Sequence, residues 1–122
     1  MTREEFEGFV LDNYNVRADY PLEEDLVTGA FRHESGKWFA LAMRISERKL
    51  GRDSDASIDV VNLKCAPDVA ESLVGVERGV YPAYHMNKMH WITVILCECD
   101  TEILAWLLDG SYELTRTKIK RK

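Results

Sequence analysis

The sequence of 122 residues has little of the residue types that mark several special protein classes. Its 7 glycines and 3 prolines exclude a collagen-like chain and a Pro/Gly-rich disordered chain. No apolar run approaches the roughly 18 residues of a membrane-spanning helix. The first residues, Met1 to Glu5, show no apolar stretch behind a basic start. We therefore expect a cytoplasmic protein that makes no membrane contact and carries no secretory signal.

Cysteine is also scarce. The three cysteines, Cys65, Cys97 and Cys99, are an odd number and cannot all pair within one chain. Cys97 and Cys99 stand two apart at the end of an expected strand, where their side chains would point the same way. A closed zinc site needs about four ligands, so this spacing alone is a weak metal signal. We expect free thiols, no metal and no cofactor.

Positive charge is in deficit, with 16 Lys and Arg against 21 Asp and Glu and a net charge of −5. This excludes a nucleic-acid binder that is basic over its whole surface. The charge is uneven, however, because residues 30–52 hold six basic and two acidic side chains, and residues 114–122 hold five basic and none acidic. One basic face on an acidic protein is a possible interpretation. The other is an ordinary mixed surface, with the tail cations offsetting a helix dipole.

What remains is an ordinary globular composition, 46% hydrophobic and 30% charged, of single-domain length, which we assign to residues 1–122. A capping box, Thr2-x-x-Glu5, predicts a first helix that ends near residues 13–15. Alternation predicts strands, and 3.6-residue periodicity predicts later helices that begin at Pro67 and after Asp100. The expected strands cover 27–33, 37–45, 57–64 and 91–97. The order α-β-β-β-α-β-α indicates an α+β domain with a largely antiparallel sheet and the helices on one face.

Two segments carry finer predictions. Strict alternation over 37–45 places two sets of side chains on opposite faces, one being Phe39, Leu41, Met43 and Ile45 and the other Trp38, Ala40, Ala42 and Arg44. In the last helix, the apolar stripe keeps its period across Gly110 and reaches Ile119. It predicts one continuous helix, with Gly110 as a potential kink.

The densest group of polar and aromatic side chains lies in 81–91. It holds two histidines, a lysine that can bind an anion, and aromatic rings that can stack on a base. The members are Tyr84, His85, Asn87, Lys88, His90 and Trp91. The plainer interpretation is that Asn87 and Lys88 form a turn, and that His90 and Trp91 begin a strand.

Motifs of the common enzyme classes are missing. There is no dinucleotide-binding or phosphate-binding glycine loop, no nucleophile elbow and no His-Glu-x-x-His sequence. A Cys–His pair rests on residue type alone. We assign no catalytic residues and expect a protein that is not an enzyme.

Three segments carry a resemblance to a known family. They are Gly36 to Leu41, Val61 to Asp68 and Pro82 to Val94, and Ser111-Tyr112 fits the same pattern. Together they resemble the MmcQ/YjbR family. The resemblance implies a small bacterial cytoplasmic protein with a CyaY-like, or secretion-chaperone-like, α+β fold. It also implies a DNA-binding label, because the family's sheet is similar to a double-wing module, but it brings no catalytic set.

Three functions follow as hypotheses. The first is DNA binding by a basic and aromatic sheet surface, with Lys37, Arg44, Tyr84, His85, Asn87, Lys88, His90 and Trp91 as the candidate contacts. The second is a chaperone-like protein-interaction module that uses the sheet face without helices. The third is a small-ligand site where His85, Asn87, Lys88 and His90 converge. Nothing in the sequence requires more than a monomer.

Overall fold

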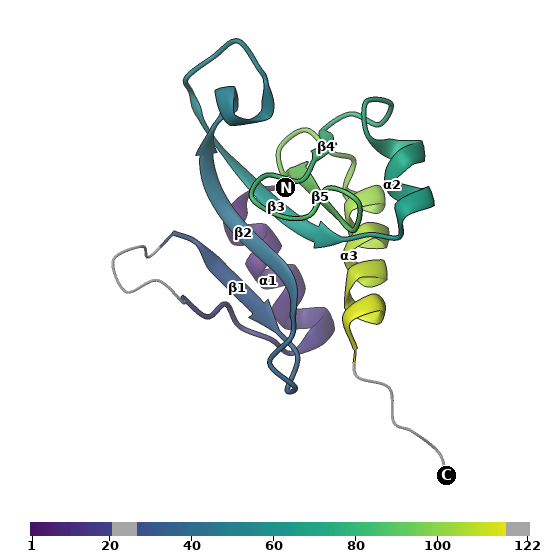
Figure 1. The fold of residues 1–122 in the computed structure, drawn as a ribbon. Coiled ribbons are helices and arrows are strands. Elements are labelled where there is room, and N and C mark those ends of the chain that lie inside the picture. Colours follow the sequence, from purple (N-terminus) through teal and green to yellow (C-terminus); the bar gives the residue numbers. More distant parts are fainter. Residues whose placement is uncertain (21–26, 117–122) are drawn as a thin grey trace.

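The computed structural model of the chain describes residues 1–20 and 27–116. Within them, five strands form one antiparallel sheet in the order β1-β2-β3-β5-β4 (Figure 1). The elements are α1 (Arg3–Tyr14), β1 (Gly29–Arg32), β2 (Trp38–Ser46), the 3₁₀ turn η1 (Glu47–Leu50), β3 (Ser57–Lys64), α2 (Pro67–Leu73), β4 (Val80–Pro82), β5 (Trp91–Ile95) and α3 (Thr101–Thr115).

The predicted α+β fold and its element order are confirmed, with one short strand added. This strand, β4, pairs with β5 at an edge of the sheet and ends in Pro82, which has no N–H to donate. At the opposite edge, Asp19 forms an isolated antiparallel bridge with Ala30 of β1, through backbone hydrogen bonds of 2.8 and 2.7 Å. Both edges of the sheet are therefore short or already paired.

Side-chain caps fix the helix starts that the sequence predicted. The Thr2 hydroxyl accepts the Glu5 N–H at 3.0 Å, and the Glu5 carboxylate accepts the Thr2 N–H at 2.8 Å, which completes the capping box of α1. Asp100 caps α3 by accepting the N–H groups of Glu102 and Ile103. The last helix continues through Gly110 to Thr115, whereas Ile119 lies outside the described residues. No helix in the described ranges is both long and apolar enough to cross a membrane.

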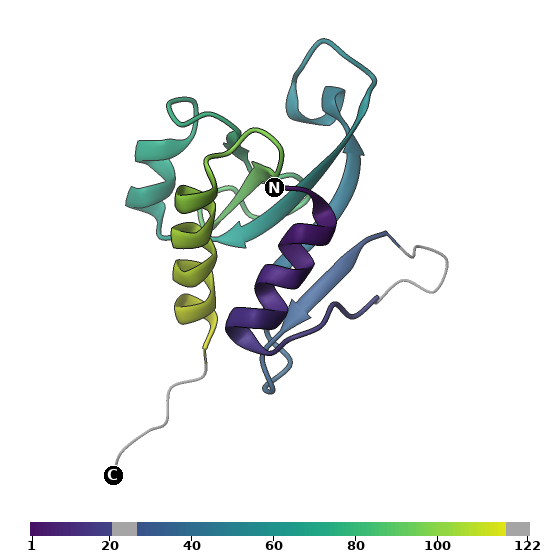
Figure 2. The ribbon, with the colours of Figure 1, turned by 180° about the vertical axis from the view of Figure 1, so that it is seen from behind.

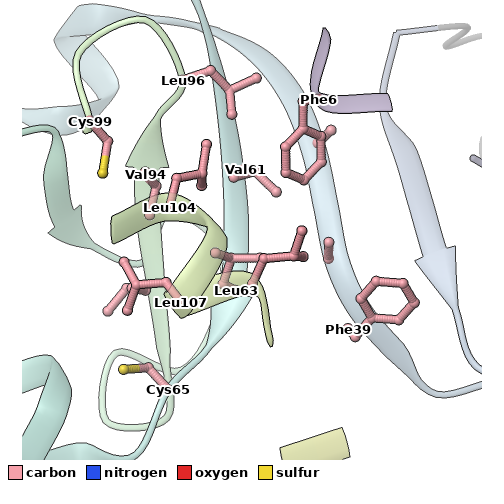
Figure 3. Close-up of a cluster of buried hydrophobic side chains, with 14 of the residues drawn as sticks. Phe6, Phe39, Val61, Leu63, Cys65, Val94, Leu96, Cys99, Leu104 and Leu107 are labelled. Atoms are coloured by element: carbon pink, nitrogen blue, oxygen red, sulfur yellow. The ribbon is translucent and has the colours of Figure 1, made fainter. Parts of the chain in front are cut away.

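The two faces of the sheet are covered differently. Figure 2 looks onto the face that carries α1 and α3, and Figure 3 shows side chains of the core between this face and the helices, among them Phe6, Val61 and Leu104. We call the opposite side the outer face. It holds a smaller buried cluster, formed by Ala30, Leu41, Met43, Val60 and Ile95. The helices therefore pack on one face, as predicted.

A β-bulge changes the predicted faces of β2. The register passes from Phe31↔Ala40 to Arg32↔Trp38 and skips Phe39. The prediction that grouped Phe39 with Leu41 and Met43 is wrong, because Phe39 lies in the helix-side core (Figure 3). Trp38 moves the other way and packs against the outer-face cluster.

The predicted strand 91–97 is two residues too long. The chain turns after Ile95, whose carbonyl accepts the N–H groups of Glu98 and Cys99. Cys97 and Cys99 consequently do not share one side of a strand: Cys97 is exposed and Cys99 is buried.

Candidate nucleic-acid interface

The loop 83–90 lies across the outer face, and a buried polar pair holds it there. Asn62 of β3 and Thr93 of β5 are register partners with no exposed surface. The Asn62 amide donates to the Tyr84 carbonyl at 2.8 Å, and the Thr93 hydroxyl accepts the Tyr84 N–H at 2.8 Å. The same hydroxyl donates to the Asn62 side-chain oxygen at 2.5 Å. In Figure 1 the loop between β4 and β5 crosses in front of β3, on the side away from α1.

Within this loop, the Asn87 side chain forms hydrogen bonds with nearby backbone N–H groups. Its side-chain oxygen accepts the N–H of Met89 at 2.8 Å and that of His90 at 3.3 Å. Its carbonyl accepts the Trp91 N–H at 2.9 Å, which leads the chain into β5. Asn87 is therefore engaged by its own turn, in agreement with the plainer interpretation of this segment.

The rings of the two candidate residues before this turn contact each other at a tilt of 44°. His85 adopts a left-handed backbone conformation with φ of 60°. Its ring lies 3.9 Å from the Tyr84 ring, centroid to centroid. His85 is exposed and Tyr84 is half-buried against the outer-face cluster. The pair thus presents an aromatic surface to solvent beside β5.

Basic and aromatic residues alternate across four neighbouring strands at one end of the outer face. The row consists of Arg32 on β1, Trp38 on β2, Lys64 on β3 and Trp91 on β5. Arg32 and Trp38 are register partners, as are Lys64 and Trp91, and the Arg32 guanidinium lies 5.7 Å from the centre of the Trp38 ring. Strand alternation places Lys64 and Trp91 on the same face as Asn62 and Thr93. We call these four residues the outer-face row.

Three lysines near the row are available to a ligand. Lys37 precedes Trp38, Lys64 belongs to the row, and Lys88 lies in the 83–90 loop. None of them forms an ion pair with an acidic side chain in the described part of the chain. Arg32, in contrast, pairs with Asp19 at 3.1 Å, so it positions Trp38 rather than offering a free charge.

Arg44 lies apart from the other candidates. It is six residues along β2 from Trp38, about 20 Å at the usual strand rise. It pairs with Asp59 at 3.6 Å. Alternation with Ala40 and Ala42, which lie in the helix-side core, places it on the opposite face. The structure therefore leaves Arg44 out. Of the other predicted residues, Trp91 belongs to the outer-face row and Lys37 directly precedes Trp38. The remaining five, Tyr84, His85, Asn87, Lys88 and His90, belong to the 83–90 loop.

Most of the remaining positive charge in residues 30–52 is compensated. Arg48 pairs with Asp55 at 2.6 Å. Arg52 pairs with Glu47 at 2.9 Å and with Glu98 at 2.8 Å. The net positive charge of this segment consequently does not form a free basic patch around η1.

Burial disfavours the thiolate form of the two buried cysteines, Cys65 and Cys99. Burial raises the pKa of Cys65, and it raises the pKa of Cys99 to about 11. His85 and His90 are both exposed, and no three His, Cys, Asp or Glu side chains of the described residues gather as a metal site would require.

Sequence reasoning missed Arg32 and Trp38 as members of the site. The reason is the bulge at Phe39, which moves Trp38 to the outer face and breaks simple alternation. Lys64 carried a usable signal, because it closes the well-predicted strand 57–64 directly opposite the start of the strand that holds Trp91.

Comparison with known proteins places the chain in a family. A family model described as YjbR matches residues 11–114. The Bacillus subtilis "Uncharacterized protein YyaQ" is 37% identical over 118 residues, which cover 95% of this chain and 99% of that protein. A crystal structure of a Pseudomonas syringae protein is similar with a TM-score of 0.91 at 39% identity, over 95% of this chain and 100% of that one.

A more distant crystal structure, from Deinococcus radiodurans, has a TM-score of 0.69 at 28% identity and covers 96% of this chain and 80% of its own. The Escherichia coli "Uncharacterized protein YjbR" is 42% identical over 55 residues, 43% of this chain and 46% of that protein. The family model spans most of the sequence, and the Bacillus subtilis and Pseudomonas syringae proteins match it over nearly their whole length. The chain therefore belongs to the YjbR family.

Proposed function

We propose that this protein binds DNA through the outer-face row and the 83–90 loop, with a preference for single strands. The observation that carries the proposal is the alternation of Arg32, Trp38, Lys64 and Trp91 across four adjacent strands. Aromatic rings on a sheet stack with unpaired bases, and neighbouring lysines contact the phosphates between them.

The expected affinity is modest. Stacking on Trp38 and Trp91 contributes about 1–3 kcal/mol per base. Three lysines neutralise at most three phosphates, and each gives a salt slope of about −0.7 for single strands. The net charge of −5 opposes the approach of a polyanion. Binding should therefore lie in the micromolar range at low salt, on the order of 10⁻⁶ M, and weaken as salt rises.

Fluorescence anisotropy tests the proposal with a labelled strand of about 12 nucleotides and its duplex, at about 50 and about 200 mM salt. The test variant is Lys64→Ala/Lys88→Ala. The control is Lys49→Ala/Arg78→Ala, which removes the same charge from exposed positions elsewhere. The proposal expects the test variant to lose affinity and salt slope while the control retains most of both. Equal losses in the two variants, or no binding at low salt, would refute it.

Protein docking is the second candidate. It rests on a groove beside α3 that shares only Lys64 with the outer-face row. The apolar outer-face cluster is already buried beneath the chain's own Tyr84 and Met86. On α3, however, Trp106 is 60% exposed and Leu114 is 51% exposed. Both line a groove of about 270 Å³ with Val69 of α2. An exposed apolar patch of this kind is typical of contact surfaces.

A chain that uses this groove for contact with its own kind should self-associate. Sedimentation of the wild type and of Trp106→Glu tests this use. A concentration-dependent dimer that Trp106→Glu abolishes would support this use. A wild type that stays monomeric at all concentrations would exclude self-association through the groove.

A further inference from the structure

A second groove, lined by aromatic and basic side chains, lies at the C-terminal ends of α1 and α3. It is bounded by the chain after α1, by the β1–β2 hairpin and by the end of α3, and its volume is about 720 Å³. That volume falls within the roughly 300–1,000 Å³ that small-molecule sites occupy. Of the outer-face row, only Arg32 borders it.

The floor of this groove is aromatic and fixed in place. The Tyr112 ring lies 4.5 Å from the Tyr14 ring and 4.4 Å from the His33 ring, centroid to centroid. The Tyr14 hydroxyl donates to Asp109 at 3.0 Å. His33 Nε2 lies 2.7 Å from the Thr115 hydroxyl, which donates to the Ser111 carbonyl at 2.7 Å and therefore accepts from His33.

These bonds have a consequence for binding. Rings that are already held cost little conformational entropy when a ligand arrives. A planar aromatic ligand can therefore pack against the cluster of Tyr14, His33 and Tyr112 without first ordering it. We call these three residues the aromatic floor.

The rim is cationic. Three arginines line the groove against one glutamate, Glu34. Arg17 is exposed and forms no ion pair with the described acidic residues. Among the described residues, Arg116 pairs only with Glu113, at 3.6 Å. Both side chains are more than half exposed, so this contact contributes little. Two guanidinium groups are thus available, and their planar donor geometry suits a phosphate.

We propose that this groove binds a nucleotide, with its base on the aromatic floor and its phosphate between Arg17 and Arg116. The inference does not depend on DNA binding by the outer face. A free mononucleotide and the 5′-phosphorylated end of a strand both present a base next to a phosphate. The experiment distinguishes these two ligands.

Titration calorimetry and amide NMR shifts provide the test, with adenosine 5′-monophosphate, adenosine and inorganic phosphate as separate probes. The nucleotide should bind more tightly than either part alone and should shift the amides of His33, Ser35 and Tyr112. Arg17→Gln/Arg116→Gln should weaken it by about tenfold, the effect of losing charged contacts to a phosphate. The control, Arg48→Gln/Arg78→Gln, removes two exposed arginines outside the groove and should change affinity less than about twofold.

A second arm uses a short strand with and without a 5′-phosphate. Tighter binding of the phosphorylated strand that depends on Arg17 and Arg116 identifies a strand end as the source, even when the free nucleotide binds poorly. The proposal is overturned if neither adenosine 5′-monophosphate nor the 5′-phosphorylated strand binds at about 5 mM. Equal affinity for inorganic phosphate and the nucleotide overturns it as well, because the floor would then play no part.

The variant Lys64→Ala/Lys88→Ala separates this inference from the proposed function. It alters the outer face and should leave nucleotide affinity unchanged. A parallel loss of nucleotide binding in this variant would show that the probe sits on the outer face and would overturn the groove assignment.

Discussion

The hydroxyl of Ser111, in the C-terminal half of α3, donates a hydrogen bond of 2.5 Å to the carbonyl of Phe39 in β2. The same oxygen accepts the backbone N–H of Lys64 at 2.8 Å. Phe39 is the bulge residue of β2, and Lys64 ends β3. One helix side chain therefore satisfies backbone groups of both strands just beyond Ala40 and Leu63, where the β2–β3 pairing ends. This contact stabilises the bulge that brings Trp38 to the outer face.

Ser111→Ala should lower the free energy of unfolding by about 1–3 kcal/mol, because two buried backbone groups lose their partner. Urea unfolding measures the change, and the amide shift of Lys64 reports the local loss. Ser72→Ala is the matched control, since Ser72 is exposed and its hydroxyl donates to the Val69 carbonyl one turn earlier in the same helix. A cost for Ser111→Ala no larger than that of the control would contradict the role of this contact.

Thr93→Val keeps the shape of the side chain and removes the hydroxyl that holds the 83–90 loop. The Tyr84 N–H and the Asn62 side-chain oxygen then lose a partner, at a cost of about 1–3 kcal/mol. Hydrogen exchange of the Tyr84 amide should accelerate, because opening of the loop becomes easier. Thr101→Val, at an exposed position, should stay within about 0.5 kcal/mol. Unchanged exchange at Tyr84 would show that other contacts hold the loop.

Trp38→Leu and Trp91→Leu should each weaken single-strand binding by about 1–3 kcal/mol, through the loss of one stacked base. Trp106→Leu on α3 is the control, because it removes an exposed tryptophan from a different surface. Anisotropy titrations at fixed salt give the comparison. A larger effect from Trp106 than from the other two would favour the α3 surface as the binding site.

The free energy of unfolding should decrease as the pH falls, because His33 is harder to protonate in the folded chain than in the unfolded chain. Burial beside Phe39 and Tyr112 lowers the pKa of His33 below its ordinary value of about 6.5. The unfolded chain therefore takes up this proton first as pH falls, and stability present above about pH 6.5 is progressively lost below it. The wild type should lose more stability than His33→Gln between about pH 7.5 and pH 5. Identical pH profiles by thermal unfolding would contradict this prediction.

Local signals in the sequence predicted much of the fold. The caps at Thr2 and Asp100 depend on residues within three positions, and both helix starts are confirmed. The expected strand 57–64 agrees with β3 (Ser57–Lys64) at both bounds. Short-range chemistry was sufficient wherever no distant segment intervened.

The sequence was less informative where a distant residue decides the geometry. The bulge at Phe39 is held by Ser111, which is 72 positions away, so alternation alone assigned Phe39 and Trp38 to the wrong faces. The pairing of Arg44 with Asp59 depends on the β2–β3 register. The aromatic floor combines residues from α1, the β1–β2 hairpin and α3, and no local sequence motif predicts this combination.

The edges of the sheet have a further consequence for association. A strand edge with free N–H and C=O groups can recruit another chain's strand and extend the sheet between molecules. Here the Asp19 bridge occupies Ala30 of β1, and β4 is a three-residue strand that ends in a proline. The described sheet is thus protected against growth by strand addition, so a partner must approach through side chains.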